Sequence, residues 1–186
     1  MSPNPPRPRS EPVPPDPAAE FSRRWPSAPP PEAPVAGEAD AAERAALARR
    51  YGALSVERLA FTAEAAPWRG GLRVSGEARA RVTQSCVVTL EPVEAELSER
   101  FERRFLPEDR LTGLDPADLD APEPLPAALD IGEMAAEAVA LGLDPYPRRP
   151  GVVFGGRAEG PEGPEAPEAG RESPFARLAA LKRGGG

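Results

Sequence analysis

Alternation of apolar residues along positions 72–105 is the feature that most constrains how this chain can fold. The apolar residues first occupy even positions and then odd ones: Leu72, Val74, Ala78, Ala80, Val82, Cys86, Val88 and Leu90, then Val93, Ala95, Leu97, Phe101 and Phe105. A period of two is typical of a β-strand that buries one face. The phase changes at Glu91-Pro92, and proline suits a turn but not a central strand. The sequence therefore predicts an antiparallel hairpin that turns at Glu91-Pro92. Of these residues, we expect Val88, Leu90, Val93 and Leu97 to pack in the core.

Capping residues predict two helices beside these strands. Asp40 and Glu43 have the spacing of a capping box, and Gly52 suits the residue that ends a helix. Asp130 and Glu133 repeat that spacing before a second apolar stripe. A further alternating segment at 59–63 and a turn at Arg69-Gly70-Gly71 complete the pattern. We expect an α+β domain, in which an antiparallel sheet of about four to six strands packs against two helices.

Proline-rich composition limits how much of the chain can fold. Of the 27 prolines, 13 lie within residues 1–34, and residues 155–172 repeat glycine, proline, glutamate and alanine. Such segments hold too few large apolar side chains to offset the entropy lost on ordering. The expected organisation is a largely disordered arm at 1–37 with a short anchor at 20–25, a folded domain at 38–153, a disordered linker at 154–174 and a short amphipathic helix at 175–182.

The chain contains no histidine and a single cysteine, Cys86. A Ser-His-Asp triad, a Cys-His pair and a Cys/His zinc site therefore cannot form within one chain. Cys86 follows the apolar phase of its strand, which favours core packing over a reactive thiol. We expect no enzymatic activity, no cofactor, no bound metal and no small-molecule substrate.

Apolar segments are too short for a membrane protein. No apolar run approaches the roughly 20 residues of a membrane helix. The N-terminus has early arginines but lacks the apolar stretch of a signal peptide. We expect a cytoplasmic protein without a membrane partner.

Charge is unevenly distributed along the chain. The net charge is −7, but residues 107–145 hold ten acidic residues and one arginine, a balance of −9 that leaves +2 for the remainder. Asp115, Asp118 and Asp120 lie in a loop of about 20 residues, a length often found in functional loops. Their spacing does not fit an EF-hand. They form either a solvated loop or a docking surface for a basic protein.

Four arginine doublets are the other candidate for partner binding: Arg23-Arg24, Arg49-Arg50, Arg103-Arg104 and Arg148-Arg149. Arginine binds phosphate with two hydrogen bonds and stacks on bases. Converging doublets would form an RNA-binding patch. However, neighbouring residues on a strand point to opposite faces, so an ordinary charged surface remains the alternative. The candidate partner-binding residues are Asp115, Asp118, Asp120, Arg103, Arg148 and Arg149.

Three segments, in this order, resemble the YceD family of bacterial proteins: the hairpin Cys86–Phe105, the helix start Leu129–Glu133 and the segment Leu143–Arg148. The segments 20–23 (Glu-Phe-Ser-Arg) and 173–176 (Ser-Pro-Phe-Ala) resemble its alphaproteobacterial branch in particular. Many members carry Cys-x-x-Cys in the hairpin, whereas this chain has Thr89 at the second position. A single thiolate without histidine cannot hold a structural zinc ion.

The resemblance implies a ribosome-biogenesis factor that supports accumulation of large-subunit (23S) ribosomal RNA. The expected partner is a precursor of that RNA or a basic ribosomal protein. The alternative is a general protein-interaction adaptor that uses the acidic loop 107–128 and has no ribosomal role.

Overall fold

The computed structural model of the chain describes residues 11–16, 19–112 and 121–152. Asp115, Asp118 and Asp120, the expected linker at 154–174 and the expected helix at 175–182 lie outside the described residues. The described elements, in chain order, are β1 (Arg24–Pro26), β2 (Val35–Glu38), α1 (Ala41–Tyr51), β3 (Ser55–Trp68), β4 (Gly71–Ser85), β5 (Pro92–Leu106), the 3-10 helix η1 (Glu108–Arg110), β6 (Glu123–Pro124), β7 (Ala128–Asp130) and α2 (Ile131–Gly142).

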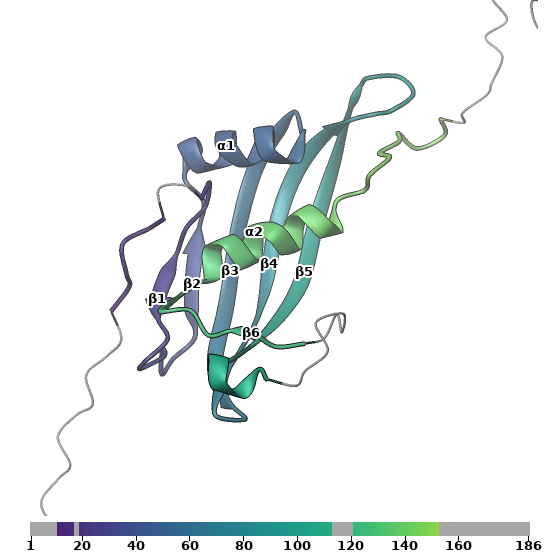
Figure 1. Cartoon of the computed structure of the whole chain (residues 1–186). Helices are drawn as coiled ribbons and strands as arrows, with labels where there is room; N and C mark the ends of the chain where they lie inside the picture. Colours follow the sequence, from purple (N-terminus) through teal and green to yellow (C-terminus); the bar gives the residue numbers. More distant parts are fainter. Residues whose placement is uncertain (1–10, 17–18, 113–120, 153–186) are drawn as a thin grey trace, which may run out of the picture. The chain divides into compact units, whose positions relative to one another are not determined.

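Five strands form one sheet in the order β2-β3-β4-β5-β6. The first four are antiparallel neighbours, and the short β6 pairs in parallel with the end of β5. β1 and β7 form a separate antiparallel pair. Both helices lie on the same face of the sheet, and α2 crosses β3, β4 and β5 (Figure 1). The α+β prediction is confirmed.

The β4–β5 hairpin is confirmed, with Ala80 opposite Leu97 and Leu72 opposite Phe105. The even-numbered apolar residues of β4 are buried, as expected from the alternation. Leu97 packs partly buried against the core. Neither of the two described helices covers the opposite face of the sheet, where charged residues such as Arg79 and Arg81 are exposed.

The position of the turn differs from the prediction. β4 ends at Ser85, and residues 86–91 form a loop in which the N–H of Leu90 donates to the carbonyl of Cys86 (2.9 Å). Leu90 has a φ of 61° and a side chain 77% exposed, so its placement in the core was wrong. Val88 and Val93 are only partly buried and lie outside the core cluster. The period of two holds only in extended backbone, and the chain leaves that conformation at Cys86.

The core lies between the sheet and the helices. It includes Leu59 and Phe61 of β3, Leu47 of α1 and the apolar stripe of α2. Two aromatic residues from the N-terminal segment join it. Phe21 and Trp25 meet the ring of Phe61 edge to face, with centroids 5.9 and 6.5 Å away. Such contacts stabilise a core by about 0.5–1.5 kcal/mol each beyond their burial.

Both helix starts follow their capping residues. The Asp40 carboxylate accepts from the N–H of Glu43 while the Glu43 side chain accepts from the N–H of Asp40, and Gly52 ends α1 at a φ of 62°. At the second helix, the Asp130 carboxylate accepts from the N–H of Glu133. The capping predictions are confirmed for both helices.

Asp130 also joins two segments that lie more than 100 residues apart. Its carboxylate accepts from the N–H of Arg23 (2.9 Å) and from the hydroxyl of Ser22. A Cβ at Gly132 would lie 2.6 Å from the carbonyl of Phe21, so only glycine allows this close approach. The Asp-Ile-Gly-Glu helix start therefore forms the seat for the N-terminal Phe-Ser-Arg segment.

Candidate interaction surfaces

At least one member of each arginine doublet is held by a carboxylate. Arg23 pairs with Glu43, Arg50 with Glu133 and Glu20, Arg103 with Glu123 and Glu137, and Arg149 with Glu91. Arg50 and Arg103 approach neighbouring turns of α2, where Glu133 and Glu137 hold them, so these arginines belong to an ion-pair network and not to an uncompensated basic patch. Sequence reasoning could find the doublets but not their partners, because each partner comes from a distant part of the chain.

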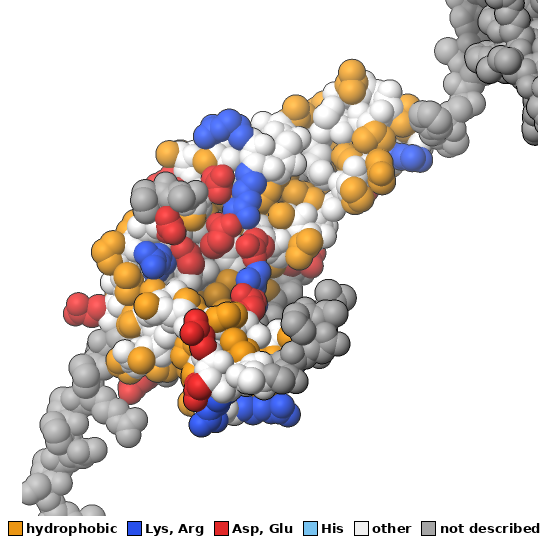
Figure 2. Space-filling model, in the orientation of Figure 1, with side chains coloured by type: hydrophobic (Ala, Val, Ile, Leu, Met, Phe, Trp, Pro, Cys, Tyr) orange, Lys and Arg blue, Asp and Glu red, His pale blue; other side chains and the backbone are white. Residues whose placement is uncertain are grey.

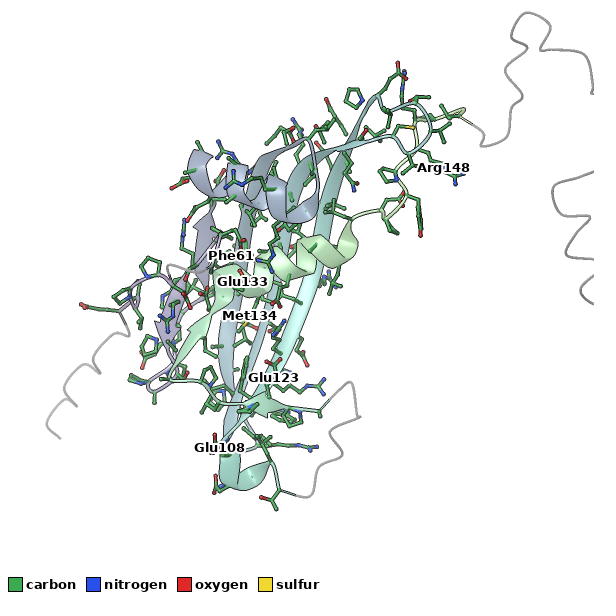
Figure 3. All side chains as sticks on the ribbon, turned by 45° about the horizontal axis from the view of Figure 1, so that its top comes forward. Phe61, Glu108, Glu123, Glu133, Met134 and Arg148 are labelled. Carbon is green, nitrogen blue, oxygen red and sulfur yellow. The ribbon has the colours of Figure 1, made fainter. Side chains whose placement is uncertain are left out.

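Arg103 connects three elements. Its guanidinium lies 3.3 Å from Glu123 of β6 and also pairs with Glu137 of α2. Figure 3 labels Glu123 beside the end of β5 and Met134 on α2, one turn before Glu137. Arg104, the sequence neighbour of Arg103, points to the opposite face of the sheet and pairs with Glu102 (2.8 Å). The geometry indicates that Arg103 holds β6 and α2 against β5.

Arg148 and Arg149 follow α2 in the segment 143–149, which packs against the hairpin loop 86–91. The N–H of Val87 donates to the carbonyl of Pro147 (2.9 Å), and the amide of Gln84 donates to the carbonyl of Asp144 (3.0 Å). Arg149 also pairs with Glu91. We call the loop 86–91 together with the segment 143–149 the hairpin-exit surface.

The hairpin-exit surface exposes apolar side chains. Val87, Leu90 and Tyr146 are 45, 77 and 68% exposed, and apolar atoms gather at this end of the molecule (Figure 2). A groove of about 520 Å³ runs between the end of α1, Val87 and the start of the 143–149 segment. Arg148 is exposed at the same end, far from Glu108 near the opposite end of the sheet (Figure 3). Exposed apolar groups beside a groove are typical of protein interaction sites.

Cys86 is fully buried at the base of the hairpin loop. Hydrogen bonds from the Thr89 hydroxyl and from the backbone N–H groups of Thr89 and Arg149 lower the pKa of its thiol to about 6. Cys86 is absent from the apolar core cluster. The position is therefore buried as expected, but its neighbours are hydrogen-bond donors.

The described residues contain no group of three or more Cys, Asp or Glu side chains that could hold a metal ion. Thr89 occupies the position of the second cysteine in a Cys-x-x-Cys motif, and its hydroxyl donates to the Cys86 thiol.

A partly buried polar cluster links the two helices. The Tyr51 hydroxyl donates to the carbonyl of Ala136 (2.8 Å), and burial raises the pKa of its phenol. Burial also raises the pKa of Glu133, against the opposing effect of Arg50 at 2.6 Å. Glu133 and Glu137 are each held by a different arginine. The two carboxylates thus connect elements and do not face a common substrate site in the described structure.

A basic cluster that the sequence reasoning missed surrounds the turn between β3 and β4. We call Trp68, Arg69, Arg73, Arg104 and Arg110 the basic turn surface. The guanidinium groups of Arg69 and Arg104 lie 5.0 and 5.7 Å from the centroid of the Trp68 ring. Arg110 donates to the carbonyl of Arg69 (3.1 Å), and Arg73 pairs in register with Arg104. Figure 2 shows basic side chains grouped at this end of the sheet.

Few carboxylates neutralise the basic turn surface. Arg69, Arg73 and Arg110 form no ion pair with any residue that the structure describes, and Glu102 is the single partner of Arg104 there. Glu108 and Asp109 precede Arg110 in η1 and are the nearest acidic residues in sequence. The Trp-Arg-Gly-Gly turn was the available sequence signal for this cluster. Only the register of β5 shows that Arg104 lies beside Arg73 and Trp68.

Residues 74–182 match the family described as large ribosomal RNA subunit accumulation protein YceD. The chain belongs to the YceD family. The matched range covers more than half of the chain and contains β5, α2 and both parts of the hairpin-exit surface. The family description names accumulation of a ribosomal RNA, which connects this YceD protein with ribosome biogenesis. It names no reaction.

No curated protein and no solved structure matched the chain. Among the described helices of the YceD protein, none is both long and apolar enough to span a membrane.

Proposed function

We propose that this YceD protein is a cytoplasmic ribosome-biogenesis factor that supports accumulation of 23S ribosomal RNA through non-catalytic contacts. The family match over residues 74–182 carries the proposal. The partner is a precursor of the large-subunit RNA or a basic ribosomal protein. The two kinds of partner require surfaces of different charge.

The basic turn surface is the better candidate for RNA contact. A tryptophan ring and guanidinium planes both stack on unpaired bases, by about 1–3 kcal/mol per base for an aromatic side chain. Arg69, Arg73 and Arg110 have no carboxylate partner in the described structure, so no acidic side chain there competes with a phosphate for their guanidinium groups. Arg148, exposed and likewise without an ion pair there, is a second candidate. Arg103 is less suited, because Glu123 and Glu137 already hold it.

The acidic residues are the candidates for contact with a basic ribosomal protein. Residues 107–145 carry a net charge of −9, which favours association with a basic protein over RNA. Asp115, Asp118 and Asp120 remain in this proposal on the basis of their sequence. Electrostatic complementarity of this kind increases the association rate and depends on salt.

Deletion of the gene tests the proposed role directly. We expect a lower ratio of mature large-subunit to small-subunit RNA and an accumulation of immature large-subunit particles. In a tagged strain, the protein should sediment with those particles at low salt. An unchanged RNA ratio together with no particle association would reject the ribosomal role and favour the adaptor alternative.

A further inference from the structure

One edge of β5 is free of strand partners over most of its length. β4 pairs with β5 from Pro92 to Phe105, whereas β6 meets the other edge only at Phe105 and Leu106. No other described strand covers residues 92–104 on that side (Figure 1). A strand edge with unpaired N–H and C=O groups is a template for an added strand.

The hydrogen bonds at the end of β5 show which residues present these groups. The carbonyl of Leu106 accepts from the N–H of Leu125 (2.8 Å), so the backbone of Leu106 faces away from β4. Backbone groups alternate along an antiparallel strand. The outward groups therefore belong to even-numbered residues: Glu94, Glu96, Ser98, Arg100 and Glu102. Pro92 is also even-numbered, so its backbone faces away from β4. Its missing N–H therefore removes no hydrogen bond to β4.

A groove of about 330 Å³ lies beside this edge. Glu99 to Arg103 of β5 line one side, and Met134, Glu137 and Leu141 of α2 line the other. Leu141 is 88% exposed, the most exposed of the large apolar side chains in the described structure. A strand added to β5 would direct alternate side chains into this groove. PDZ and PTB domains recognise extended peptides by strand addition of this kind.

The charge around the groove favours a basic occupant. On the α2 side of the edge, Glu99, Glu123 and Glu137 outnumber the one guanidinium of Arg103, and on the other side of the sheet Glu94, Glu96 and Glu102 outnumber Arg100. Glu99 forms no ion pair with the described residues. Charged residues on an edge strand also discourage aggregation. That role does not account for an exposed leucine and a groove next to the edge.

We propose that the free edge of β5 and its groove against α2 bind an extended segment of a partner protein in which basic and apolar residues alternate. The inference deepens the proposed function and rests on it only for the expectation that the partner is a ribosomal protein. The added strand would pair with the outward groups between Glu94 and Glu102. Its apolar side chains would face α2 and contact Leu141, and its basic side chains would face the other side of the sheet, near Glu94, Glu96 and Glu102.

A proline substitution tests the edge with a matched control. Arg100→Pro removes one outward N–H without removing a bond to β4, and Arg100→Ala removes the same side chain but keeps the N–H. The probe is a labelled twelve-residue peptide that alternates arginine and valine, compared with a twin that carries glutamate in place of arginine. We expect Arg100→Pro to weaken binding of the basic peptide at least about tenfold and Arg100→Ala to leave it within about threefold. Leu141→Asp, which alters an exposed side chain, should also weaken apolar contacts in the groove.

Amide exchange of the full-length protein provides the second readout. In the free protein, the N–H groups of even residues 94–102 should exchange faster than those of the odd residues, and the basic peptide should protect them. Protection already present without peptide would overturn the inference. If that protection depends on protein concentration, a second copy covers the edge, and if not, another part of the same chain does.

Equal binding by Arg100→Pro and Arg100→Ala, or equal affinity for the acidic twin, would also overturn it. Peptide binding at the edge with an unchanged RNA ratio in the deletion strain would retain the inference and reject the ribosomal role. No peptide binding at the edge, together with a lowered RNA ratio in the deletion strain, would reject the inference and retain the ribosomal role.

Discussion

At the scale of single residues, the environment of a side chain depends on residues that are distant in sequence. Cys86 is buried, but hydrogen-bond donors from the loop and from Arg149 surround its sulfur. Leu90 continues the even-numbered apolar series and is nevertheless exposed. Both residues lie where β4 ends, and each yields a test.

For Cys86, we expect Cys86→Ser to fold with a small loss of stability, because a hydroxyl can accept from the same donors. The thiol pKa is lowered to about 6 in the folded protein from an ordinary value near 9. Between these values the unfolded state binds the proton that the folded state releases, so wild-type stability rises with pH. The contribution is complete above about pH 9 and is lost as the pH falls through about 6. Denaturant unfolding of both proteins across this range measures it, and parallel pH profiles would contradict the lowered pKa.

For the hairpin, Leu97→Asp and Leu90→Asp form a matched pair. Leu97 packs against the core, so an aspartate there should destabilise the domain by on the order of 2 kcal/mol or more. Leu90 is exposed, and its replacement should change stability by less than about 0.5 kcal/mol. Thermal unfolding separates the two. Similar losses of stability in both variants would show that the loop is packed into the core.

At the scale of elements, the two helix caps have similar sequences but unequal roles. The hydrogen bonds of Asp40 lie within the start of its own helix, in the capping box with Glu43. Asp130 caps α2 and also accepts from Ser22 and Arg23. The second cap therefore joins the N-terminal segment, α2 and the β1–β7 pair.

Alanine substitutions compare the two caps. Asp40→Ala should lower the free energy of unfolding by about 1 kcal/mol. Asp130→Ala should lower it by about 1–3 kcal/mol more, because the Ser22 hydroxyl and the Arg23 N–H lose their acceptor in a part-buried site. Chemical denaturation of both variants measures the difference. Equal effects would mean that solvent replaces Asp130 at the N-terminal segment.

At the scale of the whole molecule, the charged surfaces are separated. The basic turn surface lies at the end of the sheet near η1, whereas Arg148 lies at the hairpin end (Figure 3). The two candidate sites for RNA contact therefore lie at opposite ends of the sheet. The proposed RNA contact and protein contact should respond to different substitutions.

Reversing charge on the basic turn surface should weaken association with pre-large-subunit particles. Arg69→Glu combined with Arg73→Glu should reduce it in a salt-dependent way, and the slope of log K against log salt should fall by about 0.7–0.9 for each phosphate that the variant no longer neutralises. Arg148→Glu should have a smaller effect of the same kind. Arg58→Glu, which alters an exposed arginine paired with Glu38, is the control and should have little effect. Sedimentation at two salt concentrations measures it, and equal effects of control and test variants would argue against RNA contact there.

Neutralising the acidic loop addresses the protein contact. Asp115→Asn, Asp118→Asn and Asp120→Asn together should weaken particle association while the thermal stability stays the same, since a basic protein would lose its complementary charge. Retained association would exclude these three residues as the docking surface.

The local pattern of the sequence was sufficient for several elements. Alternation predicted β4 and β5, and capping residues predicted the starts of α1 and α2, because those features depend on neighbours within four residues. The ordered set of segments was also sufficient for the YceD family. The turn was misplaced by a few residues because alternation cannot show where backbone leaves the extended conformation.

Other properties were decided only by the tertiary structure. The sequence displays four arginine doublets, but Glu43, Glu91, Glu133 and Glu137 determine which arginines are engaged. The cluster of Trp68 with Arg104 depends on strand register, and the free edge of β5 depends on where β6 ends. These interactions join residues that are dozens of positions apart, and a strand or helix pattern extends over only a few. Which charges remain free for a partner is therefore a property of the folded chain.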